Sequence, residues 1–257
     1  MGGKLKILLI SDIHGNIESL KEIINNENFD HVYFIGDAVD YGPRPAEVID
    51  KLKEIGADSV LGNHDNAVLY NIDCMCGEDT HWISVYFREN FTKKLLSKKH
   101  IDVLQNFKTN ISTEIEGFGK TLITHGSPSS PLYGYLYPWL EDEKIISMLK
   151  RTLRLNETKS TKLEYNLYIV GHTHFQFMKK INNSLLINPG SAGEPRDGDN
   201  RAAYALINTE NGSVELKRIK YDINKVIKDL EDLMIPEPYM SHLKYMFVNG
   251  KILKRNG

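Results

Sequence analysis

The chain has 257 residues, and its 32 basic residues (Lys and Arg) nearly balance its 34 acidic ones (Asp and Glu), for a formal net charge of −2 at pH 7. This balance gives no global electrostatic reason to expect nucleic-acid binding. Hydrophobic residues make up 41% and charged residues 26%, an ordinary globular composition. The length suits one large α/β-type domain or two small ones.

The chain shows no targeting or membrane signal. Its first apolar run ends at Asp12 and is too short for a signal peptide, and Lys6 breaks the myristoylation pattern that would follow Gly2. No stretch approaches the roughly 18–20 apolar residues of a membrane span. Cys74 and Cys76 are one residue apart, a poor spacing for a disulfide, so we expect reduced thiols and a cytoplasmic protein without a membrane partner.

The first half of the chain alternates strand-like and helix-like runs. Short runs rich in Leu, Ile and Val indicate buried strands, and apolar residues at a spacing of three or four indicate helices. The expected order is strand 4–10, helix 16–26, strand 31–35, helix 45–55 and strand 58–61, and then a helical segment over about 66–107 that resembles an insertion.

The second half is rich in strands, expected at 111–116, 120–124, 166–170, 175–180, 185–187, 202–207 and 213–219. Asn182-Asn183 and Asn211-Gly212 predict hairpin turns. Residues 141–162 indicate a helix followed by a polar loop. C-terminal helices are expected over about 222–250, where an apolar stripe from Ile223 to Met234 predicts core packing, with a homodimer surface as the alternative. Since no linker or repeat interrupts the chain, one domain over 1–257 is expected.

Polar clusters follow five of the strand-like runs directly. Loops at strand ends, held by a rigid sheet, commonly carry chemistry. Asp, Asn and His are delivered in this way to one rim, a pattern that predicts a binuclear metal site. The clusters are Asp12-Ile13-His14, Gly36-Asp37, Gly62-Asn63-His64-Asp65, His125-Gly126 and Gly171-His172-Thr173-His174.

These residue types suit two divalent cations held close together. Cations about 3.5–4 Å apart can clamp the attacking and leaving oxygens of a phosphoryl displacement, and a carboxylate can bridge them. Imidazole nitrogen favours Zn, Fe, Ni and Cu, whereas carboxylate and amide oxygens favour Mn and Mg. A mixed shell therefore predicts Mn first, with Fe, Ni, Co or Zn as alternatives.

The motifs D-x-H, G-D-x-x-D, G-N-H-D, a lone His-Gly after a strand, and G-H-x-H resemble those of the calcineurin-like metallophosphoesterases over roughly residues 7–207. Stretches such as 36–49, 123–138 and 187–207 look like a subgroup of small prokaryotic phosphoesterases within that superfamily. The resemblance implies an α+β, four-layer fold in which two mixed β-sheets pack as a sandwich and are flanked by helices.

The resemblance also implies roles for individual residues. One metal would be bound by Asp12, His14, Asp37 and His174, and the second by Asp37, Asn63, His125 and His172, with Asp37 bridging. A hydroxide between the metals would be the nucleophile, and His64 would assist the leaving oxygen. The remaining histidines match no motif and are expected at the surface or in the core: His31, His81, His100 and His242.

Two positions depart from relatives. Protein phosphatases of this superfamily carry Arg where this chain has Tyr41, which counts against protein phosphatase activity. Many members of the small prokaryotic subgroup carry Gly where this chain has Asp40. Asp40 is predicted to hold the His64 ring and raise its pKa, because a nearby carboxylate favours imidazolium. The alternative is that Asp40 only caps a turn before Gly42.

The loop that starts at Asn188 and includes Gly190 and Ser191 follows a strand and is rich in small residues, so its backbone N–H groups could cradle a phosphate. A tight structural turn is the alternative. Arg196 is a candidate phosphate ligand, and Arg44 a weaker one. The loop 126–139 carries Tyr133, Tyr135, Tyr137 and Trp139, which could stack on a nucleobase or simply pack the loop down.

Three hypotheses about function stand. The leading one is a binuclear phosphoesterase acting on a small phosphodiester or phosphomonoester, with nucleotides among the candidates. The second is a hydrolase of dinucleoside polyphosphates, which only the aromatic loop supports. The third is a non-catalytic scaffold, and the retention of every ligand and of His64 counts against it.

Overall fold

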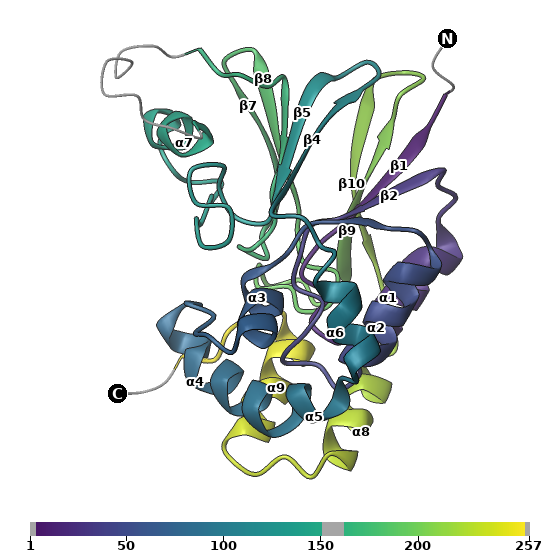
Figure 1. Ribbon diagram of the computed structural model, residues 1–257, viewed down its shortest axis with the longest axis vertical. Helices are drawn as coiled ribbons and strands as arrows, with labels where there is room; N and C mark the ends of the chain where they lie inside the picture. The colour runs from purple at the N-terminus through teal and green to yellow at the C-terminus, as the bar shows by residue number, and fades with distance from the viewer. Residues whose placement is uncertain (1–3, 151–161, 255–257) are drawn as a thin grey trace.

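The computed structural model describes residues 4–150 and 162–254, which form two mixed five-stranded sheets (Figure 1). In the first sheet β1, β2 and β3 run parallel, β9 is antiparallel to β1, and β10 is antiparallel to β9. Its order is β10 (Ser213–Ile219), β9 (Ala202–Asn208), β1 (Lys6–Ile10), β2 (His31–Phe34) and β3 (Asp58–Ser59).

In the second sheet β5, β6 and β8 are parallel to one another, with β4 antiparallel at one edge and β7 antiparallel at the other. Its order is β4 (Asn110–Ile115), β5 (Gly119–Thr124), β6 (Leu167–Ile169), β8 (Ser184–Pro189) and β7 (Gln176–Ile181).

The central strands are apolar throughout because both of their faces are buried. Side chains alternate between the two faces of a strand. In β1, Ile7 and Leu9 pack between the two sheets, whereas Leu8 and Ile10 pack against helices. The same alternation places Ile169 of β6 between the sheets and Tyr168 against the outer helix.

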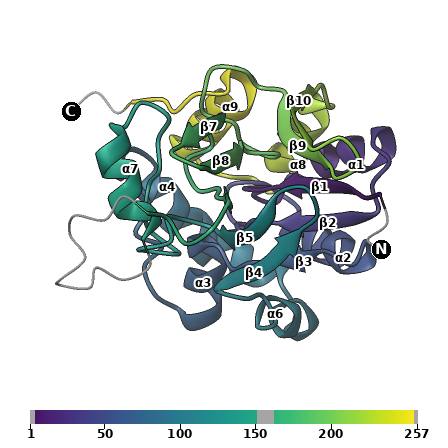
Figure 2. The ribbon, with the colours of Figure 1, turned by 90° about the horizontal axis from the view of Figure 1, so that it is seen from above.

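Helices cover both outer faces and complete four layers (Figure 1; Figure 2). The helices α1 (Ile17–Asn26), α2 (Pro45–Glu54) and α6 (Lys98–Leu104) pack on the first sheet. The helix α7 (Asp142–Leu149) packs on the second sheet through Ile145 and Leu149, on the opposite side of the molecule from α1. The α+β fold implied by the motifs is therefore confirmed.

A further group of helices lies below the two sheets in Figure 1. In α8 the residues Val226, Ile227 and Leu230 are buried in this group, so core packing of the predicted C-terminal stripe is confirmed for them, while Met234 is 86% exposed. The group comprises α3 (Asn63–Tyr70), α4 (Glu78–Phe87), the π-helical turn η1 (Arg88–Thr92), α5 (Lys93–Leu95), α8 (Ile223–Asp232) and α9 (Tyr239–Asn249).

The structure departs from the expected elements in two places. The strand expected over 58–61 ends at Ser59; Val60 still donates to the carbonyl of Phe34 at 2.9 Å, and Leu61 donates to the carbonyl of Lys108 at 2.8 Å instead of continuing along β2. The helix expected within 141–162 ends at Leu149, and most of the polar loop expected after it, 151–161, lies outside the described residues. Among the residues that the structure describes, no helix is long and apolar enough to cross a membrane.

Candidate metal centre

The loops that follow the strands are joined to one another by backbone hydrogen bonds. Asp12 donates its N–H to the carbonyl of Gly36 at 2.9 Å, and His14 donates to the carbonyl of Asp37 at 3.0 Å, so the loops after β1 and β2 lie side by side. Gly171 donates to the carbonyl of His125 at 2.8 Å, which joins the loops after β5 and β6. Ends of parallel strands thus meet at one rim of the sandwich.

Several predicted ligands have a left-handed backbone conformation, which L residues other than glycine rarely adopt. The φ angles are 52° at Asp12, 46° at His14, 64° at Asp37, 66° at His172 and 61° at His174. Such conformations cost on the order of 1–3 kcal/mol each and concentrate at functional sites. The loops turn sharply there, and the side chains face inward instead of continuing the strand.

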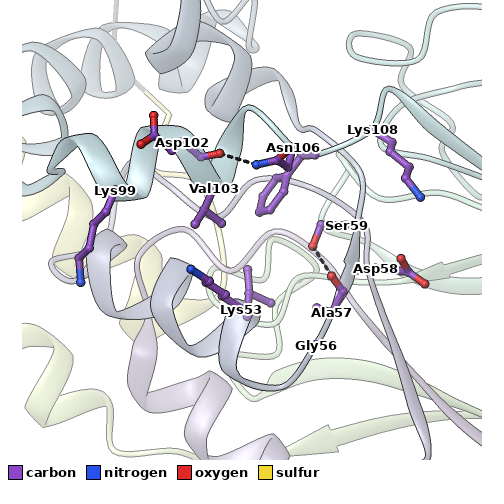
Figure 3. A pocket seen from close by; sticks show the side chains of 12 residues that line it. Lys53, Gly56, Ala57, Asp58, Ser59, Lys99, Asp102, Val103, Asn106 and Lys108 are labelled. Atoms are coloured by element: carbon purple, nitrogen blue, oxygen red, sulfur yellow. Dashed lines mark hydrogen bonds between the residues drawn. The ribbon is translucent and has the colours of Figure 1, made fainter.

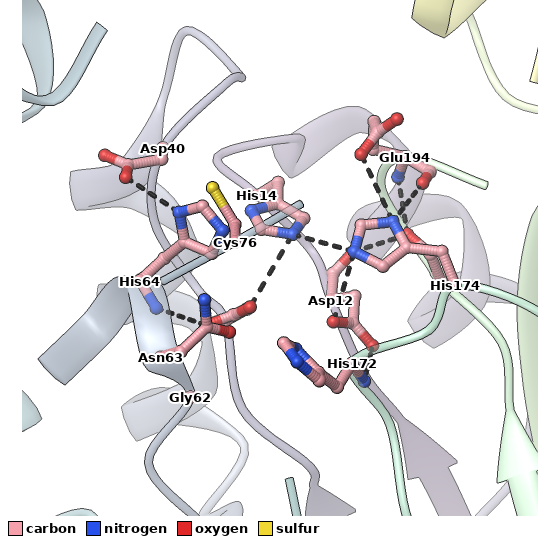
Figure 4. A network of polar contacts seen from close by, with 12 residues as sticks. Asp12, His14, Asp40, Gly62, Asn63, His64, Cys76, His172, His174 and Glu194 are labelled. Atoms are coloured by element: carbon pink, nitrogen blue, oxygen red, sulfur yellow. Dashed lines mark hydrogen bonds and ion pairs between the residues drawn. The ribbon is translucent and has the colours of Figure 1, made fainter. Parts of the chain in front are cut away.

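Three of the predicted ligands form the first cluster (Figure 4). The Nε2 atoms of His14 and His174 lie 3.2 Å apart, and Nε2 of His174 lies 3.3 Å from Oδ1 of Asp12. All three side chains are almost completely buried, with 0–2% of their surface exposed.

A second cluster lies beside the first and contains Asp37, His125 and His172. Oδ2 of Asp37 lies 3.1 Å from Nε2 of His125 and 3.9 Å from Nε2 of His14, so this carboxylate reaches towards both clusters. Oδ1 of Asn63 lies 3.0 Å from Nε2 of His125, and the Asn63 amide is oriented by its other end, which donates to the carbonyl of Cys74 at 2.8 Å.

The hydrogen bonds around the ring nitrogens show that these clusters fit metal ions. Nδ1 of His14 lies 2.8 Å from the carbonyl oxygen of Val39, and Nδ1 of His125 lies 2.7 Å from that of Ile35. A carbonyl oxygen only accepts, so each Nδ1 carries the hydrogen, and in a neutral ring the Nε2 lone pair faces inward. This arrangement is typical of metal-ligating histidines.

Among the residues that the structure describes, five buried side-chain polar atoms have no hydrogen-bond partner, and two of these five belong to the clusters. The two are Oδ1 of Asp12 and Nε2 of His172. Leaving a buried polar group unpaired costs on the order of 1–3 kcal/mol, so such atoms call for an explanation. A cation accounts for both atoms, and it also accounts for the two ring nitrogens that face each other at 3.2 Å.

Burial and charge set the protonation of the ligands. Burial lowers the pKa of His14 and of His172 well below the usual range, so both are neutral and able to bind metal. Burial also lowers the pKa of His125, but the charge of Asp37 outweighs it and raises the pKa to about 9. Burial alone would raise the pKa of Asp37, yet the neighbouring histidines, His125 first, hold it well below its usual value.

His64 lies beside the clusters but is held differently. Its Nδ1 lies 2.9 Å from Oδ2 of Asp40 and 3.1 Å from Oγ of Ser84, and its ring packs edge-on to His14 (Figure 4). Burial lowers the pKa of His64, but the charge of Asp37, then Cys74 and the bond to Asp40 raise it to about 9.

Asp40 itself is held by one helical segment. Ser84, Arg88 and Thr92 are spaced four residues apart along α4 and η1, a spacing that places side chains on one helix face. Thr92 donates to Oδ1 of Asp40 at 2.8 Å, and Nη1 of Arg88 lies 3.3 Å from Oδ2. The side chain of Asp40 is therefore committed to His64 and this helix. Only its backbone carbonyl makes the turn, accepting from Gly42 at 2.7 Å.

A separate cavity of about 550 Å³ lies between α2, β3 and α6 (Figure 3). Its rim combines Lys53, Lys99 and Lys108 with Asp58 and Asp102, and its floor includes Leu52, Val103 and Phe107. None of its lining residues belongs to the two clusters or contacts His64, so it is distinct from the candidate metal centre.

A family model described as the calcineurin-like phosphoesterase superfamily domain matches residues 5–212. The chain belongs to this superfamily. The match covers all seven predicted ligands and His64, so the geometry described above lies within the superfamily domain.

Relatives extend the similarity over nearly the whole chain. An uncharacterized protein of Methanocaldococcus jannaschii, MJ0912, is 29% identical in an alignment 256 residues long, and the match covers 91% of this chain and 95% of that protein. The symmetrical bis(5'-nucleosyl)-tetraphosphatase of Proteus mirabilis is 40% identical in an alignment 63 residues long, and the match covers 22% of this chain and 23% of that enzyme.

Solved structures share the fold. A metallophosphoesterase from Sphaerobacter thermophilus has a TM-score of 0.74 and 24% identity, with 96% of this chain and all of that chain covered. The hypothetical protein PH1004 from Pyrococcus horikoshii has a TM-score of 0.76 and 18% identity, with 96% and 99% covered.

Within this superfamily domain, the structure brings all seven predicted ligands together. At the predicted phosphate cradle, the polar groups have partners within the protein. Asn188 donates to the carbonyl of Gly171 at 2.8 Å and to Thr173, and it accepts from Gly190. Ser191 donates to the carbonyl of Asp12 at 2.6 Å and accepts from Glu194. These groups tie the metal-binding loops together, so the geometry favours the structural turn over substrate binding by Asn188, Gly190 and Ser191.

Each of the two candidate arginines is paired with a carboxylate. Arg196 is paired with the buried carboxylate of Glu194 at 2.7 Å, and its guanidinium lies over the ring of Tyr41. Substrate binding by Arg196 stays a prediction. Arg44 pairs with Asp229 of α8 at 2.6 Å.

Sequence reasoning assigned no role to four residues that hold the site. Glu194 contacts Nδ1 of His174 through its carbonyl at 2.5 Å and through its carboxylate at 3.2 Å. Asp65 accepts from the N–H groups of Asp37, Ala38 and Gly62, which joins two motif loops. Arg88 and Thr92 hold Asp40. Only Asp65 had a local signal, as the last residue of G-N-H-D.

Proposed function

We propose that the protein is a binuclear metal-dependent phosphoesterase that hydrolyses a small phosphodiester or phosphomonoester, with His64 protonating the leaving oxygen. The observation that carries the proposal is the pair of buried Asp and His clusters whose inward nitrogens share Asp37, with His64 beside them. Two divalent cations, with Mn first and Fe, Ni, Co or Zn as alternatives, would supply Lewis-acid polarisation of the phosphoryl group.

The side chains would have two separate roles, metal binding and proton donation. Asp12, His14 and His174 would hold one cation, and Asn63, His125 and His172 the other, with Asp37 shared. His64 is outside both sets. Because Asp40 holds Nδ1, the proton on Nε2 is the one available to a leaving oxygen. With a pKa of about 9, His64 carries that proton at neutral pH, as a general acid must.

A second candidate is hydrolysis of a dinucleoside polyphosphate. Two observations favour it: the aromatic residues beside His172, and the 63-residue match to a bis(5'-nucleosyl)-tetraphosphatase. A protein phosphatase is disfavoured because Tyr41 stands where those enzymes carry Arg. Tyr41 is fully buried against His14 and His64 and has no positive charge with which to bind a phosphate.

The test is a metal-reconstituted screen. The metal-free protein would be loaded with Mn, analysed for metal content, and assayed on phosphomonoesters, phosphodiesters and pyrophosphates. We expect two equivalents of metal per chain and hydrolysis of at least one ester class. No more than one equivalent at saturation would exclude the binuclear site. Two equivalents without hydrolysis of any class would favour the scaffold.

A further inference from the structure

The segment after His125 carries aromatic residues at every second position, and their rings form a continuous stack that begins at the metal centre. The ring of Tyr135 lies on that of His172, with centroids 3.9 Å apart. Tyr137 stacks on Tyr135 at 5.7 Å, and Trp139 stacks on Tyr137 at 4.7 Å, with interplanar angles of 8° and 13°. The stack leads from a predicted ligand to the surface.

Core packing does not account for this stack, because another residue anchors the segment. Leu136 is only 1% exposed and packs with Ile145 and Leu149 of α7. The aromatic residues alternate with it in the sequence and contact one another instead of joining this cluster. Trp139, at the end of the stack, is 61% exposed. Phe175 contacts its ring in a T-shaped arrangement at 5.0 Å, and more than half of the Trp139 surface is still exposed.

The guanidinium of Arg196, which is paired with Glu194, lies near both the stack and the metal centre. Burial raises the pKa of the Tyr135 and Tyr137 hydroxyls, and the nearby guanidinium of Arg196 opposes that rise at both. Arg196 also lies over Tyr41, which packs against His14. An aromatic face next to a guanidinium and a metal-binding cluster matches a ligand that has a flat base and several phosphate charges.

We propose that this aromatic face, formed by Tyr135, Tyr137 and Trp139, binds the base of a nucleotide substrate, with the base stacked on the outer face of Trp139. The inference rests on the proposed function and names its substrate class. Two tyrosine rings separate Trp139 from His172, so the base lies far from the scissile phosphate. The substrate is therefore an extended nucleotide, a nucleoside polyphosphate or a dinucleotide. Stacking needs only a π face, so any base is accepted.

Fluorescence gives a test that does not depend on turnover. The sequence has two tryptophans, so Trp82→Phe leaves Trp139 as the only one. ATP added to the metal-loaded Trp82→Phe protein should quench this fluorescence saturably, whereas inorganic tripolyphosphate, which has similar charge but no base, should not. Equal responses to both, or none to either, would overturn the proposal.

Kinetics provides the second test. Stacking of one base contributes about 1–3 kcal/mol. With Trp139→Ala, the ratio of kcat/KM for ATP or a diadenosine polyphosphate to that for base-free pyrophosphate or glycerol phosphate should fall about tenfold, mostly through KM. Trp139→Phe should restore most of that ratio because it restores a π face. An unchanged ratio, or failure of Phe to exceed Ala, would contradict base stacking.

The two proposals can fail separately. Hydrolysis of base-free esters with no preference for a base would support the phosphoesterase activity and contradict base binding by the aromatic face. Base-dependent quenching of Trp139 without hydrolysis of any ester would show a nucleotide-binding face on a protein that is not a phosphoesterase, which would overturn the substrate assignment as well.

Discussion

The ligand histidines and His64 are the same side chain held in two ways. His14 and His125 direct Nδ1 to backbone carbonyl oxygens, which are neutral acceptors. His64 directs Nδ1 to the carboxylate of Asp40. The first arrangement leaves the inner nitrogen facing the clusters, and the second places a carboxylate beside the ring. The rings differ in their outer partner and not simply in charge, because the charge of Asp37 raises the pKa of both His125 and His64 to about 9.

The largest effect should come from Asp37, which both clusters share. Asp37→Asn keeps the shape of the side chain but removes the negative charge that would stabilise the two bound cations. Because metal ions contribute several kcal/mol of transition-state stabilisation, turnover should fall by on the order of 10³-fold or more. Elemental analysis should show that both metals are weakened. His14→Ala is the control and should weaken mainly one; equal losses in the two variants would contradict a shared carboxylate.

Removing His64 should separate the two roles. His64→Ala should retain both metals and lose about 10²–10⁴ in turnover, the range of a general acid. Metal content and kcat would be measured on the same preparation. His31→Ala, which removes a histidine outside the site, should change neither quantity. Metal loss in the His64 variant would place this residue among the ligands.

A smaller effect is expected when the outer partner of His64 is changed. The pKa of His64 is about 9, and its charged form persists below that pH. Asp40→Asn removes a negative charge that favours this form, so the pKa falls and the protonated ring is lost at lower pH. The alkaline limb of activity should move down by roughly one pH unit, with metal content unchanged.

Two substrates sharpen this test. An alkyl ester has a poor leaving group and needs the proton, so it should lose more activity in Asp40→Asn than a nitrophenyl ester, whose leaving oxygen departs nearly unassisted. Thr92→Val removes one hydrogen bond to Asp40 and keeps the carboxylate. The alkaline limb of the pH–activity profile should therefore move less in this variant than in Asp40→Asn. An unchanged pH profile with equal losses on both substrates would mean that Asp40 acts only as part of the turn.

The smallest effect is expected at His174, which combines both arrangements, since its Nδ1 faces the carbonyl and the carboxylate of Glu194. Glu194→Gln leaves the carbonyl in place. Metal affinity should therefore fall by about tenfold, the low end for partners of ligands. Isothermal titration with Mn would measure it. A loss as large as that of His14→Ala would show that the carboxylate, not the carbonyl, orients the ring.

That the seven predicted ligands meet at one rim could be predicted because each lies in a polar cluster directly after an apolar run. Their assignment to two metals comes from the family resemblance and stays a prediction. Core strands could be predicted for the same reason, as in β1 and β6. The residues that hold the ligands could not. Glu194 is 20 residues from His174, and Arg88 is 48 from Asp40. A buried ion pair across such separations depends on how loops and helices pack, which no single-sequence pattern encodes.

For a related reason, the geometry favours a structural turn at Asn188, Gly190 and Ser191, and phosphate binding there stays a prediction. Small residues allow another group to come close to the loop backbone, but the sequence does not show whether that group is a phosphate or a neighbouring loop. In the structure the neighbouring loop that contains Asp12 accepts the hydrogen bonds of this loop, through its backbone carbonyl groups. Gly193 is so close to Ile13 that a Cβ at this position would lie 1.7 Å from its carbonyl oxygen. The small residues serve loop packing.

The left-handed backbone at Asp12, His14, Asp37, His172 and His174 has a practical consequence. These conformations lower the stability of the metal-free fold, and a ligand that binds only the folded state restores it by RT ln(1 + [L]/Kd). At 100 times Kd that gain is about 2.7 kcal/mol. Melting temperature should therefore rise with metal concentration, so a thermal scan can rank candidate cations before any substrate is known.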